Sequence, residues 1–285
     1  MTEQGEARVT QPAHQQTQQE WQQVTSRAGI TYLVSGHPDA PPLLFLHGIG
    51  GDGRCFARQL AQFRRDFRAV AWNMPGHNGS VPLPLVTMDA LAAALAAFIG
   101  ELGLVRPVLV GHSMGGMIAL RLLAEAPHLA RALVLTQTSA AFGGKDPAWA
   151  ERFVAERLGP LDAGQTMASL APCTVTAMAG RNADPEGIAL AQHCMAQVPD
   201  STYRDTVLVL RGFDQRSALG GIAVPALLIA GSEDHAAPAD AMARMAARIP
   251  GAVFTVLEGA GHLAHLEQPL RFNEVLDGFL RGLPA

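Results

Sequence analysis

A serine held between two glycines, in the segment Gly111-His-Ser-Met-Gly115, constrains this chain more than any other feature. An apolar run at 107–110 precedes it, and an apolar, helix-compatible run at 116–126 follows it. The order predicts a strand, a tight turn and a helix. A side chain at either glycine would collide with the strand or the helix, and such a turn raises the Ser113 hydroxyl above the edge of a sheet.

This arrangement is typical of the nucleophile elbow of serine hydrolases. It leaves the N–H of Met114 at a helix N-terminus, aimed at incoming negative charge. The five residues alone are only moderately specific, because glycine- and serine-rich loops match them by chance. If Ser113 is a nucleophile, the chain must also supply a base, an acid and a second donor for an oxyanion.

The composition is that of a folded chain with a well-buried core. Apolar residues make up 48% of the 285 residues and charged residues 16%, which suits one large α/β domain with an insertion, or two domains. A net charge of −4 without a basic cluster gives no reason to expect a nucleic acid partner. The three cysteines are scattered and lack metal-ligand spacing, so we expect buried thiols in a reducing compartment.

The N-terminus is polar and lacks the apolar region of a signal peptide. The alanine-rich run at 91–99 is too short to cross a bilayer. The sequence therefore predicts a cytoplasmic protein with no membrane contact, and it leaves the oligomeric state open. Residues 1–20, rich in glutamine and threonine, are predicted to form a disordered or loosely attached tail.

Strand-like and helix-like segments alternate with short connections in the first half of the chain. The predicted strands are 30–34, 43–46, 68–72, 108–110 and 132–135, and the predicted helices are 54–67, 90–102 and 116–126. The strand at 30–34 is expected to be antiparallel and near an edge. The alternation predicts a mostly parallel, doubly wound sheet, whose ligands lie beyond the carboxyl ends of its strands.

The strand pattern breaks off between residues 138 and 221. Helix-like segments replace it at 147–158, 163–170, 173–179, 185–198 and 201–211. We interpret 138–221 as a helical cap inserted over the site, so that 21–137 and 222–285 form the core. Strands at 226–230 and 253–257, with helices at 239–248 and 269–280, are expected to complete the sheet domain.

Two loops that follow these last strands hold candidate partners for the serine. Residues 231–238 read Gly-Ser-Glu-Asp-His-Ala-Ala-Pro, and residues 258–269 read Glu-Gly-Ala-Gly-His-Leu-Ala-His-Leu-Glu-Gln-Pro. Both loops lie at carboxyl ends of strands, on the same side of the sheet as Ser113. Each loop offers more than one titratable side chain: Glu233, Asp234 and His235 in the first, and His262 and His265 in the second.

Four motifs in this order resemble the α/β-hydrolase superfamily. They are His-Gly-x-Gly-Gly at 47–51, Gly-His-Ser-Met-Gly-Gly at 111–116, Gly-x-x-Asp-x-x-x-Pro at 231–238 and Gly-x-Gly-His-x-x-x-Leu-Glu-x-Pro at 259–269. The resemblance spans roughly residues 28–283. In the stretch Met-Pro-Gly-x-x-Gly-Ser and the expected cap, the chain is similar to 3-oxoadipate enol-lactonases and related carboxylesterases. The resemblance implies the α/β-hydrolase fold.

The resemblance also assigns roles to residues of this sequence. Ser113 would be the nucleophile, His262 the base that later protonates the leaving group, and Asp234 the acid that orients His262. The backbone N–H groups of Ile49 and Met114 would receive the oxyanion. The implied reaction cleaves a small-molecule carboxylic ester or lactone through an acyl-enzyme on Ser113. No cofactor motif or metal motif is present, and we expect neither group.

Several other side chains near the site are expected to be structural. His47 would shape the oxyanion loop through hydrogen bonds, His112 would pack beside the strand, and His265 would pack or cap the following helix. Asn73 stands where many relatives have aspartate, at a position that is usually structural. Core packing is the expected role for a further set of apolar residues, with the lining of an apolar pocket as the alternative; these are Met114, Met117, Trp149, Phe153 and Met178.

Other functions fit the same motifs. A C–C bond hydrolase or a cofactor-free haloperoxidase would use the same triad, and a ligand-binding member of the fold would keep it without catalysis. Epoxide hydrolases and haloalkane dehalogenases fit less well, because their elbow nucleophile is an aspartate. The sequence leaves open the identity and chain length of the substrate.

Overall fold

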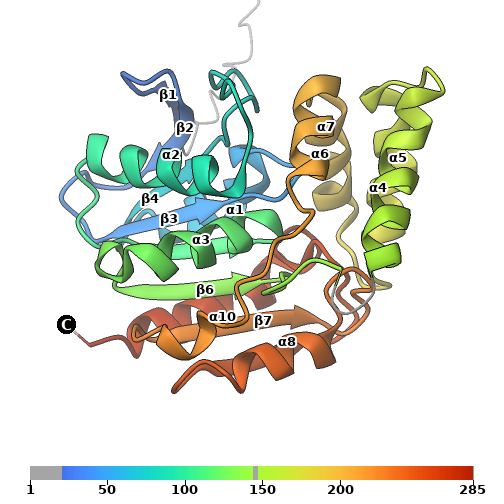
Figure 1. Cartoon of the computed structure of the whole chain (residues 1–285). Coiled ribbons are helices and arrows are strands. Elements are labelled where there is room, and N and C mark those ends of the chain that lie inside the picture. The colour runs from blue at the N-terminus through green and yellow to red at the C-terminus, as the bar shows by residue number, and fades with distance from the viewer. Residues whose placement is uncertain (1–20, 144–146, 285) are drawn as a thin grey trace, which may run out of the picture.

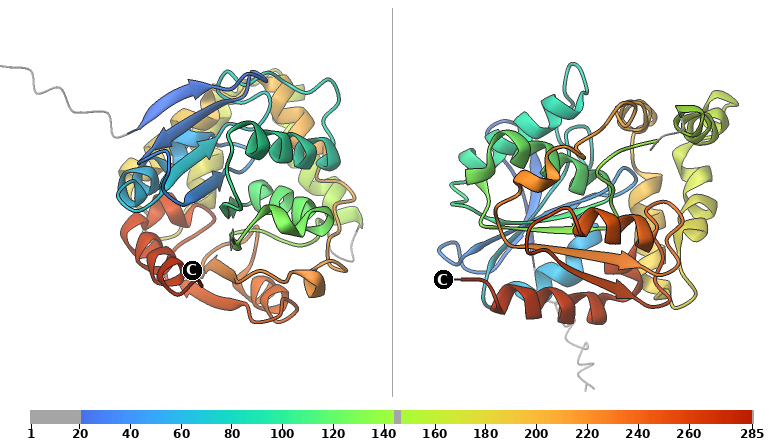
Figure 2. Two further views of the ribbon diagram at one scale, coloured as in Figure 1. Left: turned by 90° about the vertical axis from the view of Figure 1, so that its left-hand side faces the viewer. Right: turned by 60° about the horizontal axis from the view of Figure 1, so that its bottom comes forward.

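The computed structural model of the chain describes residues 21–143 and 147–284. In these ranges, eight strands form one sheet in the order β1-β2-β4-β3-β5-β6-β7-β8, between two layers of helices (Figures 1 and 2). Strand β2 runs antiparallel to both of its neighbours, and the strands from β4 to β8 in that order are parallel. The predicted tail lies outside the described residues.

Strands β2 to β8 lie close to their predicted positions, and β1 is additional. The strands are β1 (Gln22–Thr25), β2 (Thr31–Ser35), β3 (Pro42–Leu46), β4 (Arg68–Trp72), β5 (Val108–His112), β6 (Ala132–Thr136), β7 (Ala226–Gly231) and β8 (Val253–Leu257). The α-helices are α1 (Ala57–Phe63), α2 (Met88–Glu101), α3 (Met114–Glu125), α4 (Pro147–Asp162), α5 (Met167–Met178), α6 (Pro185–Ala196), α7 (Asp200–Leu208), α8 (Ala239–Ala246), α9 (Ala264–Glu267) and α10 (Pro269–Arg281). Short 3-10 helices are η1 (Gly53–Phe56), η2 (Pro127–Leu129) and η3 (Leu219–Gly221).

The central strands are apolar throughout because helices cover both faces of the sheet. In β3, Leu44 and Leu46 belong to one buried cluster, together with side chains of α2, α3 and α8. Leu43 and Phe45 alternate with them and join the opposite cluster, with side chains of α1 and α10. The sheet is therefore a rigid platform whose carboxyl edge carries the loops of interest.

Four elements differ clearly from the sequence prediction, and one of them is the short helix α9, which was not expected. Strand β1 was not expected, since Gln22–Thr25 is mostly exposed and is stabilised by its pairing with β2. The helix predicted at 54–67 is η1 followed by α1, which ends at Phe63. Helix α5 is one helix where two were predicted, and it continues through Pro172 because its buried side packs against α6.

Helices α4 to α7, here called the helical segment, follow β6 and lie beyond the ends towards which β3, β6 and β7 point (Figure 1). They share an apolar cluster of their own, which also includes Cys55 of η1 and Leu263 and Leu266 of the last loop. The helical segment therefore has its own core and is anchored to the sheet domain there. The boundaries of a cap at 138 and 221 stay a prediction.

Two further sequence expectations concern the cysteines and the membrane. Cys55 and Cys194 are buried, but Cys173 is exposed, so the prediction of three buried thiols is wrong for Cys173. It lies on α5, on the side that faces away from the apolar cluster. Among the helices of the described ranges, none combines the length and the apolar character that a membrane crossing requires.

Candidate active site

Ser113 occupies the sharp turn between β5 and α3. Its backbone angles, φ 51° and ψ −119°, lie in a region that residues with side chains rarely adopt. The flanking glycines make the turn possible. A Cβ on Gly111 would come within 2.5 Å of the Cα of Gly116, and one on Gly115 would overlap the carbonyl oxygen of Leu46. The glycines of the motif are thus required by close backbone approach.

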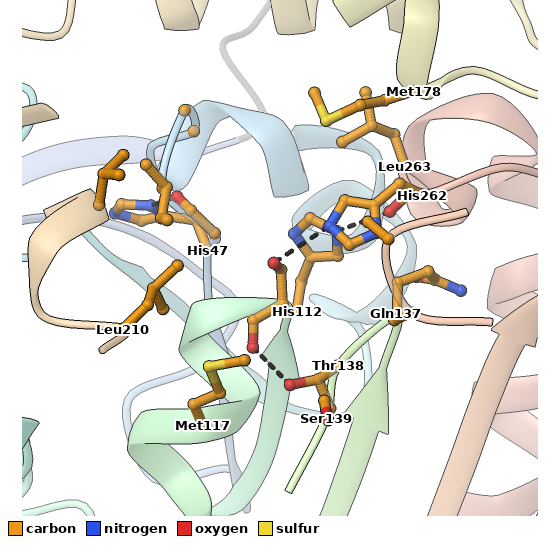
Figure 3. A pocket seen from close by; sticks show the side chains of 18 of the residues that line it. His47, His112, Met117, Gln137, Thr138, Ser139, Met178, Leu210, His262 and Leu263 are labelled. Atoms are coloured by element: carbon orange, nitrogen blue, oxygen red, sulfur yellow. Dashed lines mark hydrogen bonds between the residues drawn. The ribbon is translucent and has the colours of Figure 1, made fainter. Parts of the chain in front are cut away.

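Hydrogen bonds from the neighbouring strand hold this strained turn. The N–H of Ser113 donates to the carbonyl of Thr136 at 3.0 Å. The hydroxyl of Thr138 donates to the carbonyl of Ser113 at 2.6 Å, as the lower dashed line in Figure 3 shows. Nothing in the local sequence pattern around Thr138 indicates this contact with the elbow.

The structure brings Ser113, His262 and Asp234 together. The Nε2 atom of His262 lies 3.1 Å from the Ser113 hydroxyl oxygen (Figure 3). Its Nδ1 atom lies 2.8 Å from Oδ2 of Asp234. The other oxygen of Asp234 accepts the N–H groups of Ala236 at 2.8 Å and Ala237 at 2.9 Å. One carboxylate oxygen is therefore fixed by the backbone while the other faces the imidazole.

The surroundings of Asp234 favour its charged form. Burial by itself would raise the pKa of this carboxyl, but the adjacent His262 and the two N–H donors outweigh it, so the pKa of Asp234 lies below its usual value. An ionised Asp234 accepts a proton-bearing Nδ1. The Nε2 atom of a neutral His262 is then the acceptor that faces the serine hydroxyl.

The other titratable side chains of the two loops are not brought to Ser113. The Glu233 carboxylate accepts the N–H of Arg181 at 2.8 Å and pairs with its guanidinium. His235 is exposed. His265 is buried and stacks on Phe56, with 4.7 Å between ring centroids. The geometry therefore favours the same acid and histidine as the resemblance does.

The loop at 47–51, the candidate oxyanion loop, is fixed by a neutral histidine. The Nε2 atom of His47 accepts the N–H of Met74 at 2.9 Å, so Nδ1 carries the proton and donates to the carbonyl of Gly48 at 2.8 Å. Burial, with a smaller effect of the nearby His77, lowers the pKa of His47 to about 3. His47 is thus a structural hydrogen-bonding residue, as its motif position suggested.

Fixing the Gly48 carbonyl also orients the N–H of Ile49. The two groups belong to one trans peptide, so they point in opposite directions. His77 holds the next carbonyl, since its Nε2 lies 3.1 Å from the Ile49 oxygen. A Cβ on Gly48 would come within 3.0 Å of the Ser113 Cβ, which places this peptide beside the serine. The N–H of Met114 lies on the adjacent residue, in the first turn of α3, where N–H groups lack intrahelical acceptors.

The side chains of His112 and Asn73 hold backbone groups near the site through hydrogen bonds. The Nε2 atom of His112 lies 2.7 Å from the carbonyl oxygen of His262 and donates to it. Burial first, and the neighbouring His262 second, lower the pKa of His112 to about 3, so the ring is a neutral donor. The amide of Asn73 bridges the N–H of Gly53 and the hydroxyl of Thr31, each at 2.7 Å, which agrees with its expected structural role.

A buried carboxylate that the sequence analysis passed over holds the loop of the candidate base. Glu267 is 1% exposed. Its Oε2 atom accepts the N–H groups of Gly180 and Gly261, and its Oε1 atom accepts that of Leu263, each at 2.8 Å. Since Gly261 and Leu263 flank His262, this carboxylate fixes the backbone of the histidine from both sides. The available signal was a glutamate inside the apolar stretch at 263–269.

The same loop is joined to the helical segment. The N–H of His262 donates to the carbonyl of Met178 at 2.8 Å, and the N–H of Asn182 donates to the carbonyl of Gly259 at 3.1 Å. The contact is close, because a Cβ on Gly261 would overlap the Met178 carbonyl oxygen. The position of the histidine therefore depends on the connection between α5 and α6.

The sequence pattern of the alpha/beta hydrolase fold matches residues 41–269, which is most of the chain. The chain belongs to the alpha/beta hydrolase fold family. Its eight-stranded, mostly parallel sheet agrees with that assignment. The predicted superfamily and fold class are therefore confirmed.

Named relatives in the family are similar along nearly their whole length. A Pseudomonas syringae protein provisionally named carbamate hydrolase RutD is 29% identical over 87% of this chain and 96% of its own. The 3-oxoadipate enol-lactonase 1 of Acinetobacter baylyi is 27% identical over 91% of this chain and 97% of its own. A solved thermophilic esterase of Thermogutta terrifontis superposes with a TM-score of 0.80 at 25% identity, covering 93% of this chain and 99% of that one.

In this member of the family, a cavity of about 160 Å³ lies above Ser113, between the sheet and the helical segment. Met117, Trp149, Phe153 and Met178 line it, so the pocket-lining alternative holds for these four residues. Met114 is not among the lining residues, and its fully buried side chain belongs to the core under α3. Within the described part of the chain, no three histidine, cysteine or acidic side chains are grouped so as to hold a metal ion.

Proposed function

We propose that the chain hydrolyses carboxylic esters or lactones through an acyl-enzyme on Ser113. The observation that carries this proposal is the hydrogen-bonded series from the Ser113 hydroxyl through His262 to Asp234, which opens into a largely apolar cavity. A serine hydroxyl is a weak nucleophile by itself, and this series supplies the base and the group that orients the base.

The proposed reaction begins when Ser113 Oγ attacks the carbonyl carbon while His262 Nε2 takes the hydroxyl proton. The carbonyl oxygen becomes an oxyanion that accepts the N–H groups of Ile49 and Met114. The intermediate then collapses, and the leaving alkoxide takes the proton from His262; in a lactone this alcohol stays attached to the acyl chain. Water attacks the acyl-enzyme by the same route and regenerates Ser113. Loss of one oxyanion donor typically raises the activation free energy by about 3 kcal/mol.

The names of the relatives support a hydrolase of this general kind. Besides the enol-lactonase, a pimeloyl-[acyl-carrier protein] methyl ester esterase of Xanthomonas campestris pv. campestris is 29% identical over 88% of this chain and 98% of its own. These identities are low, so the preferred ester is inferred from the lining of the cavity and not from the substrates of the relatives. The cytoplasmic location and the division of the chain into core and cap stay predictions from the sequence.

A fluorophosphonate probe followed by peptide mass spectrometry tests the proposal. We expect a single adduct on Ser113, and loss of aryl ester hydrolysis in Ser113→Ala. The matched control is Ser139→Ala, since Ser139 lines the same cavity but donates to the carbonyl of Ala141. Labelling of another residue, or hydrolysis that survives Ser113→Ala, would overturn the proposal. Turnover of vinylogous diketones without turnover of esters would reassign the reaction to C–C cleavage.

A further inference from the structure

The cavity above Ser113 contains one permanently charged side chain. Arg157 of α4 lines it, and no aspartate, glutamate or lysine is among the described lining residues. Three of the lining histidines, His47, His112 and His265, add no charge to the cavity. Burial lowers the pKa of His47, His112 and His265, so these rings are neutral. The cavity is therefore apolar and positively charged at one place, on the wall that the helical segment forms.

Arg157 is held in place by two aromatic neighbours. Its guanidinium carbon lies 5.1 Å from the centroid of the Phe153 ring, and the guanidinium is close enough to the Tyr203 phenol to act on the pKa of that group. Both neighbours also line the cavity, and Tyr203 is 3% exposed. Burial raises the pKa of Tyr203, an effect that Arg157 opposes only in part, so the phenol is neutral and gives Arg157 no negative charge.

No carboxylate of the described residues forms an ion pair with Arg157. The contrast is with Arg204, next to Tyr203 in sequence, which reaches Asp162 of α4 at 2.5 Å. The helical segment thus pairs an arginine outside the cavity and leaves the one inside it without an anion. Arg157 is partly buried, so it loses part of its hydration to the apolar cavity without gaining a counter-ion there.

We propose that Arg157 binds a carboxylate of the substrate, so that the preferred substrates are esters or lactones with a carboxylate remote from the scissile bond. The guanidinium presents several N–H donors in one plane, which matches the two oxygens of a carboxylate. Phe153 and Tyr203 restrict its rotation and so reduce the entropy lost on binding. This inference rests on the proposed function, since it names the substrate class of the same site.

The first test compares two ester pairs that differ in one carboxylate. Mono-p-nitrophenyl adipate and p-nitrophenyl hexanoate place it on the acyl side, and 4-carboxyphenyl acetate and phenyl acetate place it on the alcohol side. In Arg157→Met we expect kcat/KM for the anionic member of one pair to fall on the order of tenfold or more, and for its neutral member to stay within about twofold. The retained neutral activity shows that the variant is folded.

Two further variants make this comparison sharper. Arg157→Lys keeps the charge but loses the planar donor pair, so its preference for the anionic ester should be intermediate. Arg204→Met removes a cation from the same pair of helices outside the cavity, and its preference should equal that of the wild type. The inference is wrong if Arg157→Met lowers the anionic and neutral rates equally in both pairs, or changes neither.

The second test measures binding without turnover. In Ser113→Ala, we expect monomethyl adipate to bind more tightly than methyl hexanoate in isothermal titration calorimetry, and Arg157→Met in that background to abolish the difference. Equal binding of the two esters would refute the carboxylate site. If the difference in binding is present but the wild-type enzyme hydrolyses no ester, the hydrolase proposal fails while the carboxylate site stands.

Discussion

Replacing Glu267 by glutamine should destabilise the protein strongly, although the two side chains have nearly the same shape. The carboxylate accepts three backbone N–H groups, two at one oxygen and one at the other. Glutamine has one acceptor oxygen and a donor NH₂ group. It can keep the two bonds from Gly180 and Gly261, but its NH₂ group then faces the N–H of Leu263.

The expected cost follows from these contacts. A hydrogen bond to a charged group contributes about 1.5–3 kcal/mol, and a buried donor left without a partner costs about 1–3 kcal/mol. The lost hydrogen bond and the unpaired Leu263 N–H are the same change, so their costs are not added. We expect Glu267→Gln to lower the free energy of unfolding by about 3 kcal/mol. His262 lies between two of the affected residues, so kcat should fall by about tenfold or more with a smaller change in KM.

Urea denaturation followed by tryptophan fluorescence, with initial ester rates measured in parallel, provides the assay. The matched control is Glu258→Gln in the same loop, whose side chain is 76% exposed and pairs with Arg181. It should change the free energy of unfolding by less than about 0.5 kcal/mol. If Glu267→Gln stays within about 1 kcal/mol of the wild type, the three N–H groups do not require an anion and the reasoning is refuted.

Three further outcomes are expected. Asp234→Asn should lower kcat about 10⁴-fold in steady-state assays, because the histidine loses its tautomeric control; a kcat near the wild-type value would contradict the proposed triad. His47 and His112 have a pKa of about 3 when folded and about 6.5 when unfolded, so below pH 6.5 the unfolded chain binds more protons. Each of the two buried rings should therefore lower the free energy of unfolding by about 2 kcal/mol between pH 7 and pH 5. Equal urea midpoints at the two pH values would contradict the burial of these rings in the neutral form. His47 and His112 should not steepen the acid limb of the pH profile of ester turnover above pH 5, because their pKa of about 3 keeps both rings neutral there; a limb steeper than a single ionisation would show that other groups take part.

The sequence was most informative where the backbone leaves little choice. The glycines around Ser113 are imposed by contacts with Leu46 and Gly116, so the elbow could be read from a short local pattern. The buried strands were equally legible, because coverage on both faces makes them continuously apolar. Their parallel order then placed the loops that hold Asp234 and His262 at one edge of the sheet.

Other features depend on partners that are distant in sequence. Strand β1 is polar, and only its pairing with β2 defines it. Helix α5 continues through Pro172 because of tertiary packing against α6, which overrides the local preference. Glu267 stood inside a quoted motif, but its role arises from three donors in two separate loops. Arg157 is one of two arginines on α4, and periodicity does not tell which one faces a cavity.

The contact between the α5–α6 connection and the His262 loop limits which parts of the helical segment can be exchanged between relatives without loss of catalysis. Helices α4 and α7 form much of the far wall of the cavity, and sequence drift there alters which molecules fit. Residues 178–182 hold His262 directly through the Met178 carbonyl, and indirectly through the Gly180 N–H, which donates to Glu267. A chimaera that exchanges α4 and α7 with those of a relative should therefore acquire a new selectivity at little catalytic loss. A chimaera that exchanges only residues 178–182 should lose turnover with every ester, because the backbone groups that hold His262, the proposed base, would then come from another protein.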